Sequence, residues 1–124
     1  MAAYVMLVDD SATVRLLASK ALSAAGFSII EATDGIDALE KMADAEEVKL
    51  IVCDVNMPRM NGLEFIEALT HTGAVPPPVI MLTTEGHPDL VRTAKMSGAR
   101  GWMVKPFKPE LLVAAAKKLT SHAG

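Results

Sequence analysis

Short apolar runs alternate with segments of helical periodicity along the whole chain. Residues Tyr4–Val8 are apolar at every position, which is typical of a strand buried on both faces of a sheet. Similar runs occur at residues 27–30, 50–53, 79–82 and 102–104. The pattern therefore predicts five short strands.

Between these runs, apolar residues recur at spacings of three and four, the period of a helix buried on one side. The first such segment begins after Ser11, a good N-cap residue, and ends at Gly26. Further helices are predicted around residues 36–43, 63–69, 88–98 and 109–119, the second of the five following an Asp34-Gly35 turn signal. Pro88 and Pro109 suit the first turns of the last two helices.

Strands and helices that alternate in this way imply a parallel sheet with helices on both faces. We expect an α/β fold, a doubly wound five-stranded parallel sheet with strand order 2-1-3-4-5. The alternation runs without a linker or a low-complexity segment, so residues 1–124 are expected to form a single domain.

Composition narrows the class of protein. Of the 124 residues, 51% are hydrophobic, which supports a globular core, and the net charge of −3 gives no reason to expect nucleic acid as a partner. No apolar run approaches the roughly 20 residues of a membrane span, and Asp9 and Asp10 interrupt the N-terminal run too early for a signal peptide. Cys53 is the only cysteine, which fits a reducing compartment. We expect a cytoplasmic protein without membrane insertion.

Charge is distributed unevenly along the chain. Residues 1–87 contain 13 acidic residues and 5 Lys or Arg, whereas residues 88–124 contain 2 acidic residues and 7 Lys or Arg. The basic third consists either of ordinary solvated helix faces or of a docking surface for an acidic partner.

Polar residues follow every predicted strand. Glu31, after the second strand, is expected to be a solvated strand end, and the others follow four neighbouring strands. They are Asp9 and Asp10 after the first strand, Asp54 after the third, Thr83 after the fourth and Lys105 after the fifth. These four strands are neighbours in the order 2-1-3-4-5, and ligands of such folds bind at the carboxyl ends of the strands. We therefore expect the five side chains to share one pocket.

The chemistry of these residues favours phosphoryl transfer. Three carboxylates in one pocket repel one another and need a cation, and their hard oxygen atoms suit Mg²⁺. Thr83 and Lys105 can contact phosphoryl oxygens, and the Asp54 carboxylate can act as the nucleophile. The alternative is a polar cluster in which Lys105 merely neutralises carboxylates.

The whole chain resembles the receiver domain of bacterial two-component response regulators. The resemblance is carried by the Asp9-Asp10 pair, the D-x-x-M-P-x-M-x-G motif from Asp54 to Gly62, the Thr83 hydroxyl and the Lys105-Pro106-Phe107 triplet. Members of this family have a flavodoxin-like fold. The sequence includes no output domain, which makes it similar to the single-domain, chemotaxis-type (CheY-like) members.

The resemblance implies a role for each of these residues. Asp54 would accept a phosphoryl group from a histidine kinase, and Asp10, Asp54 and the backbone carbonyl of Asn56 would bind Mg²⁺, with Asp9 acting mostly through water. Thr83 would donate to a phosphoryl oxygen, and Lys105 would bridge the phosphoryl group and a carboxylate. Such a protein is a signalling protein that assists its own phosphorylation and dephosphorylation rather than an enzyme.

The resemblance also implies how the signal would be transmitted. Phosphorylation would reshape the face formed by the fourth helix, the fifth strand and the last helix, and so control a downstream partner such as a flagellar motor switch component. Trp102 takes the place of the switch aromatic, usually Tyr or Phe, and is either a partial switch or a half-buried anchor. Asn56 and Glu85 occupy positions that modulate the phosphoryl lifetime, and a phosphatase would be a further partner.

Other functions remain open at this point. Within the same class, the protein could be a phosphorelay intermediate, a phosphate sink or a receiver that binds without phosphorylation. An aspartyl-phosphate phosphatase of the haloacid dehalogenase type usually has D-x-D after its first strand, where this chain has Asp9-Asp10. In a flavodoxin-like electron carrier the same two aspartates would repel the FMN phosphate.

Overall fold

A computed structural model describes residues 4–44, 48–57, 59–71, 76–83, 92–93, 95–96 and 98–121. Its centre is a five-stranded sheet in the order β2-β1-β3-β4-β5, with every neighbouring pair parallel. The strands are β1 (Tyr4–Val8), β2 (Ser28–Ala32), β3 (Val48–Asp54), β4 (Val79–Thr83) and β5 (Ala99–Val104). The predicted fold class and strand order are confirmed.

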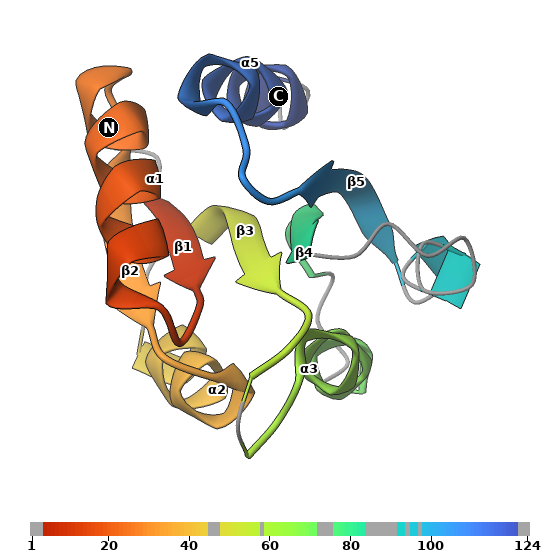
Figure 1. The fold of residues 1–124 in the computed structure, drawn as a ribbon. Coiled ribbons are helices and arrows are strands. Elements are labelled where there is room, and N and C mark those ends of the chain that lie inside the picture. The colour runs from red at the N-terminus through yellow and green to blue at the C-terminus, as the bar shows by residue number, and fades with distance from the viewer. Residues whose placement is uncertain are drawn as a thin grey trace.

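Helices cover both faces of the sheet (Figure 1). Helices α1 (Ala12–Ala24) and α5 (Pro109–Ser121) pack against each other on one face, and α2 (Gly35–Asp44) and α3 (Gly62–Thr70) lie together on the other. Residues 92–93 and 95–96 are helical, and Gly98, the predicted end of this helix, is a turn residue with φ of 111°. Residues 88–91, 94 and 97 of the predicted helix lie outside the described residues. Within the described part of the chain, no helix is long and apolar enough to cross a membrane.

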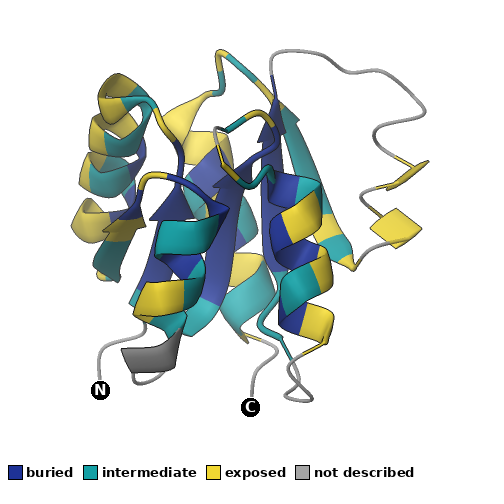
Figure 2. Ribbon diagram, turned by 90° about the horizontal axis from the view of Figure 1, so that it is seen from below, coloured by how far each residue is buried: buried dark blue, intermediate teal, exposed yellow. Residues whose placement is uncertain are grey.

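The central strands β1, β3 and β4 are mostly buried, as their unbroken apolar runs predict, whereas the edge strands β2 and β5 are only partly buried (Figure 2). Successive strand residues point to opposite faces, so the core divides into two layers. In β1, Met6 packs toward α2 and α3, whereas Val5 and Leu7 pack toward α1 and α5. This double coverage explains why the sequence shows no polar alternation in the central strands.

Local signals set the ends of the helices. The Ser11 hydroxyl accepts a hydrogen bond from the Val14 N–H at the start of α1, and Gly26 follows the end of α1 with φ of 101°. Asn61 forms a reciprocal capping box with Glu64 at the start of α3. Both predicted ends of the first helix are confirmed, and the capping box adds a signal that periodicity alone does not show.

The predicted bounds of β1 are confirmed, but the other strands continue beyond their predicted ends or begin elsewhere. Strand β2 extends to Ala32, so Glu31 lies inside the strand, where it pairs with Leu7 of β1, rather than after it. Strand β5 begins at Ala99 instead of residue 102, because Ala99 and Gly101 pair with β4 on either side of a register shift at Arg100. Backbone pairing thus continues beyond the apolar residues that mark a strand in sequence.

Cys53 lies in β3 directly before Asp54 and is fully buried. Its Sγ donates to the backbone carbonyl of Asp54 at 3.3 Å. Burial, and then the charges of Asp54 and Asp9, raise the pKa of this thiol well above its usual value. Cys53 is therefore a neutral packing residue behind the carboxyl end of the sheet.

Gly62 is required where α3 begins, because its backbone lies against that of Asp54. A Cβ added at Gly62 would be 2.3 Å from the Asp54 carbonyl oxygen. We expect Gly62→Ala to lower the free energy of unfolding by about 1–3 kcal/mol, measured by urea denaturation. Gly101→Ala is the matched control, since its Cβ would be 3.2 Å from the Ile80 side chain, which can move. Equal losses in the two variants would contradict this account.

Candidate functional site

Three aspartates meet at the carboxyl edge of the sheet. Asp54 is the last residue of β3, and Asp9 and Asp10 directly follow the neighbouring strand β1. One carboxylate oxygen from each residue lies within 4.8 Å of the other two. Asp9 is 2% exposed and Asp54 is 5% exposed, whereas Asp10 is exposed to solvent. The predicted carboxylate cluster therefore exists in the fold.

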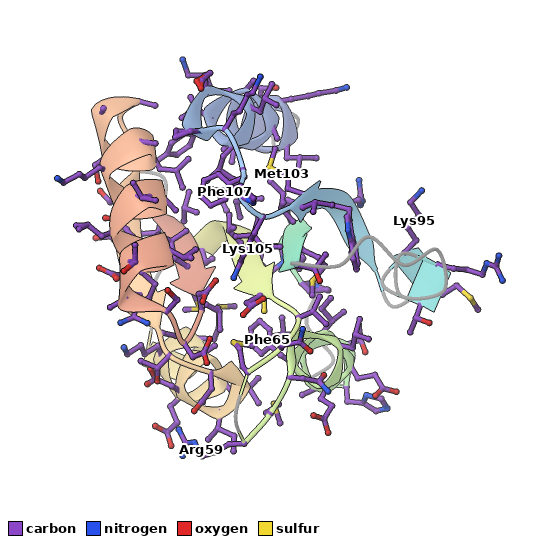
Figure 3. The ribbon with its side chains drawn as sticks, viewed as in Figure 1. Arg59, Phe65, Lys95, Met103, Lys105 and Phe107 are labelled. Atoms are coloured by element: carbon purple, nitrogen blue, oxygen red, sulfur yellow. The ribbon has the colours of Figure 1, made fainter. Side chains whose placement is uncertain are left out.

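Lys105 enters this cluster from the end of β5 (Figure 3). Its Nζ lies 2.8 Å from Asp9 Oδ2 and 3.4 Å from Asp54 Oδ1. The backbone N–H of Lys105 donates to the carbonyl of Thr83 at 2.7 Å, and the following peptide bond to Pro106 is cis. One ammonium group thus pairs with two carboxylates, and the backbone hydrogen bond to Thr83 fixes Lys105 next to the end of β4.

The charges of the cluster are only partly balanced. Burial raises the pKa of Asp54, the charge of Asp9 raises it further, and Lys105 opposes both. Burial lowers the pKa of Lys105, but the hydrogen bonds and charges of Asp9 and Asp54 together outweigh burial, so this pKa lies above its usual value. A protonated Lys105 leaves net negative charge in the pocket. A divalent cation with oxygen ligands, as Mg²⁺ is, is compatible with this donor set.

Backbone contacts hold the end of β3 in place. Val55 N–H donates to the Leu82 carbonyl at 3.0 Å, and the Asn56 backbone lowers the pKa of the Asp54 carboxyl, against the larger effect of burial. Thr83 ends β4, next to β3, and is fully buried. The structure thus brings Thr83 and Asn56 to the same edge as the aspartates, while Glu85 and the neighbouring Thr84 lie outside the described residues.

Trp102 lies in β5, at the edge of the sheet. It is half-buried and packs against the core layer between the sheet and α2 and α3. Its indole Nε1 is buried, and among the described residues it finds no hydrogen-bond partner. This position does not decide between a partial switch and an anchor, and a buried N–H without an acceptor is energetically unfavourable.

Two arginines near the site were not identified from the sequence. Arg15 on α1 donates from Nη1 to the backbone carbonyl of Asp9 and pairs with Glu31 at 3.1 Å. Arg59, in the loop after β3, pairs with Asp34 at 2.7 Å. In sequence both are ordinary polar positions, because their partners lie 6 to 25 residues away. No signal in a single sequence distinguishes them from solvated arginines.

The fold and this cluster agree with the family comparison. A family model described as "Response regulator receiver domain" matches residues 5–117. The chain belongs to the response regulator receiver domain family. Within that family its curated relatives are chemotaxis proteins of the CheY type, which are signalling proteins.

The relatives cover most of the chain. Chemotaxis protein CheY1 of Helicobacter pylori is 38% identical over 109 residues, which are 86% of this chain and 88% of that protein. Among solved structures, the chemotaxis response regulator CheY4 of Vibrio cholerae is 40% identical, with a TM-score of 0.87 over 96% of this chain and 99% of that one. A CheX-CheY-BeF₃-Mg²⁺ complex from Borrelia burgdorferi matches with a TM-score of 0.87 at 25% identity, covering 94% of this chain and 87% of that one.

The raised pKa of Asp54 predicts a pH-dependent gain in stability when its charge is removed. The folded protein holds a proton on Asp54 more tightly than the unfolded chain does, so the cost of charging it is absent below the usual pKa of 3.8 and present above the folded value. Without Mg²⁺, we expect Asp54→Asn to raise the free energy of unfolding at pH 7, and the gain to shrink as the pH falls toward 4.

The free energy of unfolding of both variants can be measured by urea denaturation at a series of pH values, and Asp34→Asn should change it in the opposite direction. The hydrogen bond from Arg59 lowers the pKa of Asp34, so charged Asp34 stabilises the fold above pH 3.8, and this contribution is lost as the pH falls through the folded pKa. We expect Asp34→Asn to lower the free energy of unfolding at pH 7. A gain in Asp34→Asn, or a loss in Asp54→Asn, would contradict the electrostatic description of the site.

Proposed function

We propose that this protein is a chemotaxis-type response regulator that accepts a phosphoryl group on Asp54. The observation that carries this proposal is the cluster of Asp9, Asp10 and Asp54 oxygens within 4.8 Å of one another, with Lys105 Nζ 3.4 Å from Asp54. A buried carboxylate at a strand end, with an ammonium group beside it, has the nucleophile and the fixed charge that phosphoryl transfer needs.

Asp10, Asp54 and the Asn56 carbonyl would hold Mg²⁺, with Asp9 mostly contacting it through water. The ion would neutralise charge on the phosphoryl oxygens. An Asp54 oxygen forms a bond to phosphorus while the bond from phosphorus to the donor's histidine nitrogen breaks, which leaves an acyl phosphate and a free imidazole. Lys105 contacts the phosphoryl oxygens from the side of β5, and Thr83 donates its hydroxyl from the end of β4.

The phosphodonor in this proposal is a histidine kinase. A pocket of about 280 Å³ lies beside Lys105, and its lining is mostly apolar: Val14, Leu17, Lys105, Pro106 and Phe107. Leu16 and Leu17 on α1 are 55% and 51% exposed. An apolar surface that borders the acceptor supports contact with a protein rather than with small donors alone.

The output surface in this proposal lies around β5 and α5. Lys95, Arg100 and Lys117 are exposed there, and a pocket of about 290 Å³ is lined by residues 95 and 99–102. This basic surface supports an acidic downstream partner, such as a flagellar motor switch component. Phosphorylation shifts Thr83, and the shift changes the room available to Trp102 at the edge of this surface.

Further parts of the proposal concern extent, lifetime and location. The receiver domain would cover residues 1–124, which extends the matched range 5–117, because β1 begins at Tyr4 and α5 continues to Ser121. Asn56 and Glu85 would tune the phosphoryl lifetime, and a phosphatase would be a further partner. The cytoplasm stays the predicted location.

Intact mass spectrometry tests the acceptor. Incubation with acetyl phosphate and Mg²⁺ is expected to add one phosphoryl group to the wild-type protein and none to Asp54→Asn, because the amide lacks the nucleophilic oxygen. Chelation of Mg²⁺ should abolish the adduct. An adduct that persists in Asp54→Asn would place the acceptor elsewhere, and no adduct in any protein would refute the proposed function.

Trp102 fluorescence tests communication with the output surface, since this is the only tryptophan in the chain. Beryllofluoride with Mg²⁺ should change its intensity or emission maximum, because the buried Nε1–H has no partner among the described residues and a rearrangement can supply one. The change should be absent in Asp54→Asn. If mass spectrometry shows that the protein is phosphorylated but Trp102 fluorescence does not change, a switching role for Trp102 is contradicted.

A further inference from the structure

We propose that the ion pair between Arg59 and Asp34 positions the metal-binding end of the β3–α3 loop and thereby sets the Mg²⁺ affinity of the site. The β3–α3 loop is residues 55–61, of which all but residue 58 are described. This inference rests on the proposed function, because it takes the Asn56 carbonyl as a Mg²⁺ ligand. Arg59 and Asp34 act through the loop and are positioning residues.

The ion pair has a two-point geometry. Arg59 Nε lies 2.7 Å from Asp34 Oδ2, and Nη2 lies 3.1 Å from Oδ1. The Asp34 side chain is only 6% exposed, whereas that of Arg59 is 55% exposed. Two parallel hydrogen bonds from a guanidinium fix orientation as well as distance. Arg59 lies at the tip of the loop, next to α2 (Figure 3).

The loop backbone needs such a contact. Arg59 has φ of 63°, in the left-handed region that a non-glycine residue adopts at a cost of roughly 1–2 kcal/mol. Contacts outside the loop must offset this cost, and the described contacts that the Arg59 side chain makes are those to Asp34. The ion pair therefore stabilises a backbone conformation that the loop would not favour by itself.

Asp34 is a rigid anchor for the loop. Its Oδ1 accepts from the Asp37 N–H at 2.8 Å, and its carbonyl accepts from Ala38 N–H at 3.0 Å, which fixes it to the first turn of α2. The neighbouring Gly35 N–H donates to the Met60 carbonyl at 3.2 Å. A Cβ at Gly35 would be 2.6 Å from Met60 Cγ, so the loop is packed tightly onto this turn.

The same loop carries the metal-binding groups at its other end. Gly62 N–H closes the loop by donating to the Val55 carbonyl at 2.9 Å, and Asn56 lies one residue further on. This hydrogen bond joins the two ends of the loop, and the contact at Arg59 holds its middle. Together they limit how the loop residues can rearrange. Loss of that contact would widen the range of positions of the Asn56 carbonyl and weaken a site that needs near-octahedral geometry.

Titration of Mg²⁺ followed by ¹H–¹⁵N NMR at fixed ionic strength tests the inference on the wild type and on Arg59→Gly. Glycine adopts φ of 63° without strain, so this variant removes the ion pair but still permits the loop conformation. We expect the Mg²⁺ dissociation constant to rise about 10-fold. If Arg59 acted only by repelling Mg²⁺, its removal would instead lower the dissociation constant, because a cation near the carboxylates would be lost.

Three further variants separate positioning from charge. Asp34→Asn retains a side chain that caps a helix as well as aspartate does, and it should weaken Mg²⁺ to a similar extent. A double variant with Arg59→Gly and Asp34→Asn should bind Mg²⁺ no more weakly than either single variant, because the two residues act as a unit. Lys41→Gln is the matched control: it removes the Lys41–Asp37 pair of α2, which is 3.4 Å long and does not touch the loop, and should leave Mg²⁺ affinity unchanged.

Each outcome of the titration decides one of the two proposals. Wild-type Mg²⁺ binding with unchanged or tighter binding in Arg59→Gly would overturn the positioning role and leave the proposed function intact. No Mg²⁺ binding by the folded wild type would refute the proposed function itself. If Arg59→Gly does not fold in a urea titration, Arg59→Lys replaces it; loss of the two-point contact should then weaken Mg²⁺ binding, and wild-type affinity would overturn the inference.

Discussion

The crowding of carboxylates at one edge of the sheet is the constraint on which the rest of this structure depends. Asp9 and Asp54 are almost fully buried, and one ammonium group, that of Lys105, contacts both. Burying charge is expensive unless partners surround it, so the ends of β1, β3, β4 and β5 must converge closely. The Lys105 N–H to Thr83 carbonyl bond and the Val55 N–H to Leu82 carbonyl bond maintain that convergence.

Most of the fold could be predicted from the sequence because burial on both faces leaves a strong local pattern. Strand β1 has the predicted bounds, and α1 begins after Ser11 as predicted. The aspartates and Lys105 could also be predicted, since each directly follows an apolar run and the strand order brings those ends together. The ends of the edge strands were predicted less accurately, because backbone pairing and not hydrophobicity determines where β5 begins.

The contacts that support the site could not be predicted, because they join residues distant in sequence through ordinary polar side chains. Arg59 and Asp34 are 25 residues apart, and the Asp34-Gly35 pair predicts only a turn. In the structure, Asp34 is a buried anchor for a neighbouring loop, and Gly35 is small because Met60 occupies the adjacent space. Such roles depend on which loops the topology places side by side.

The buried thiol of Cys53 can report the local opening of β3. The side chain is completely shielded, and its Sγ contacts the backbone of Asp54. A thiol reagent can reach it only when β3 separates from its neighbours, so the labelling rate measures the free energy of that opening. A cysteine introduced at the surface would react first, which allows site-specific attachment of a probe while the native cysteine remains in place.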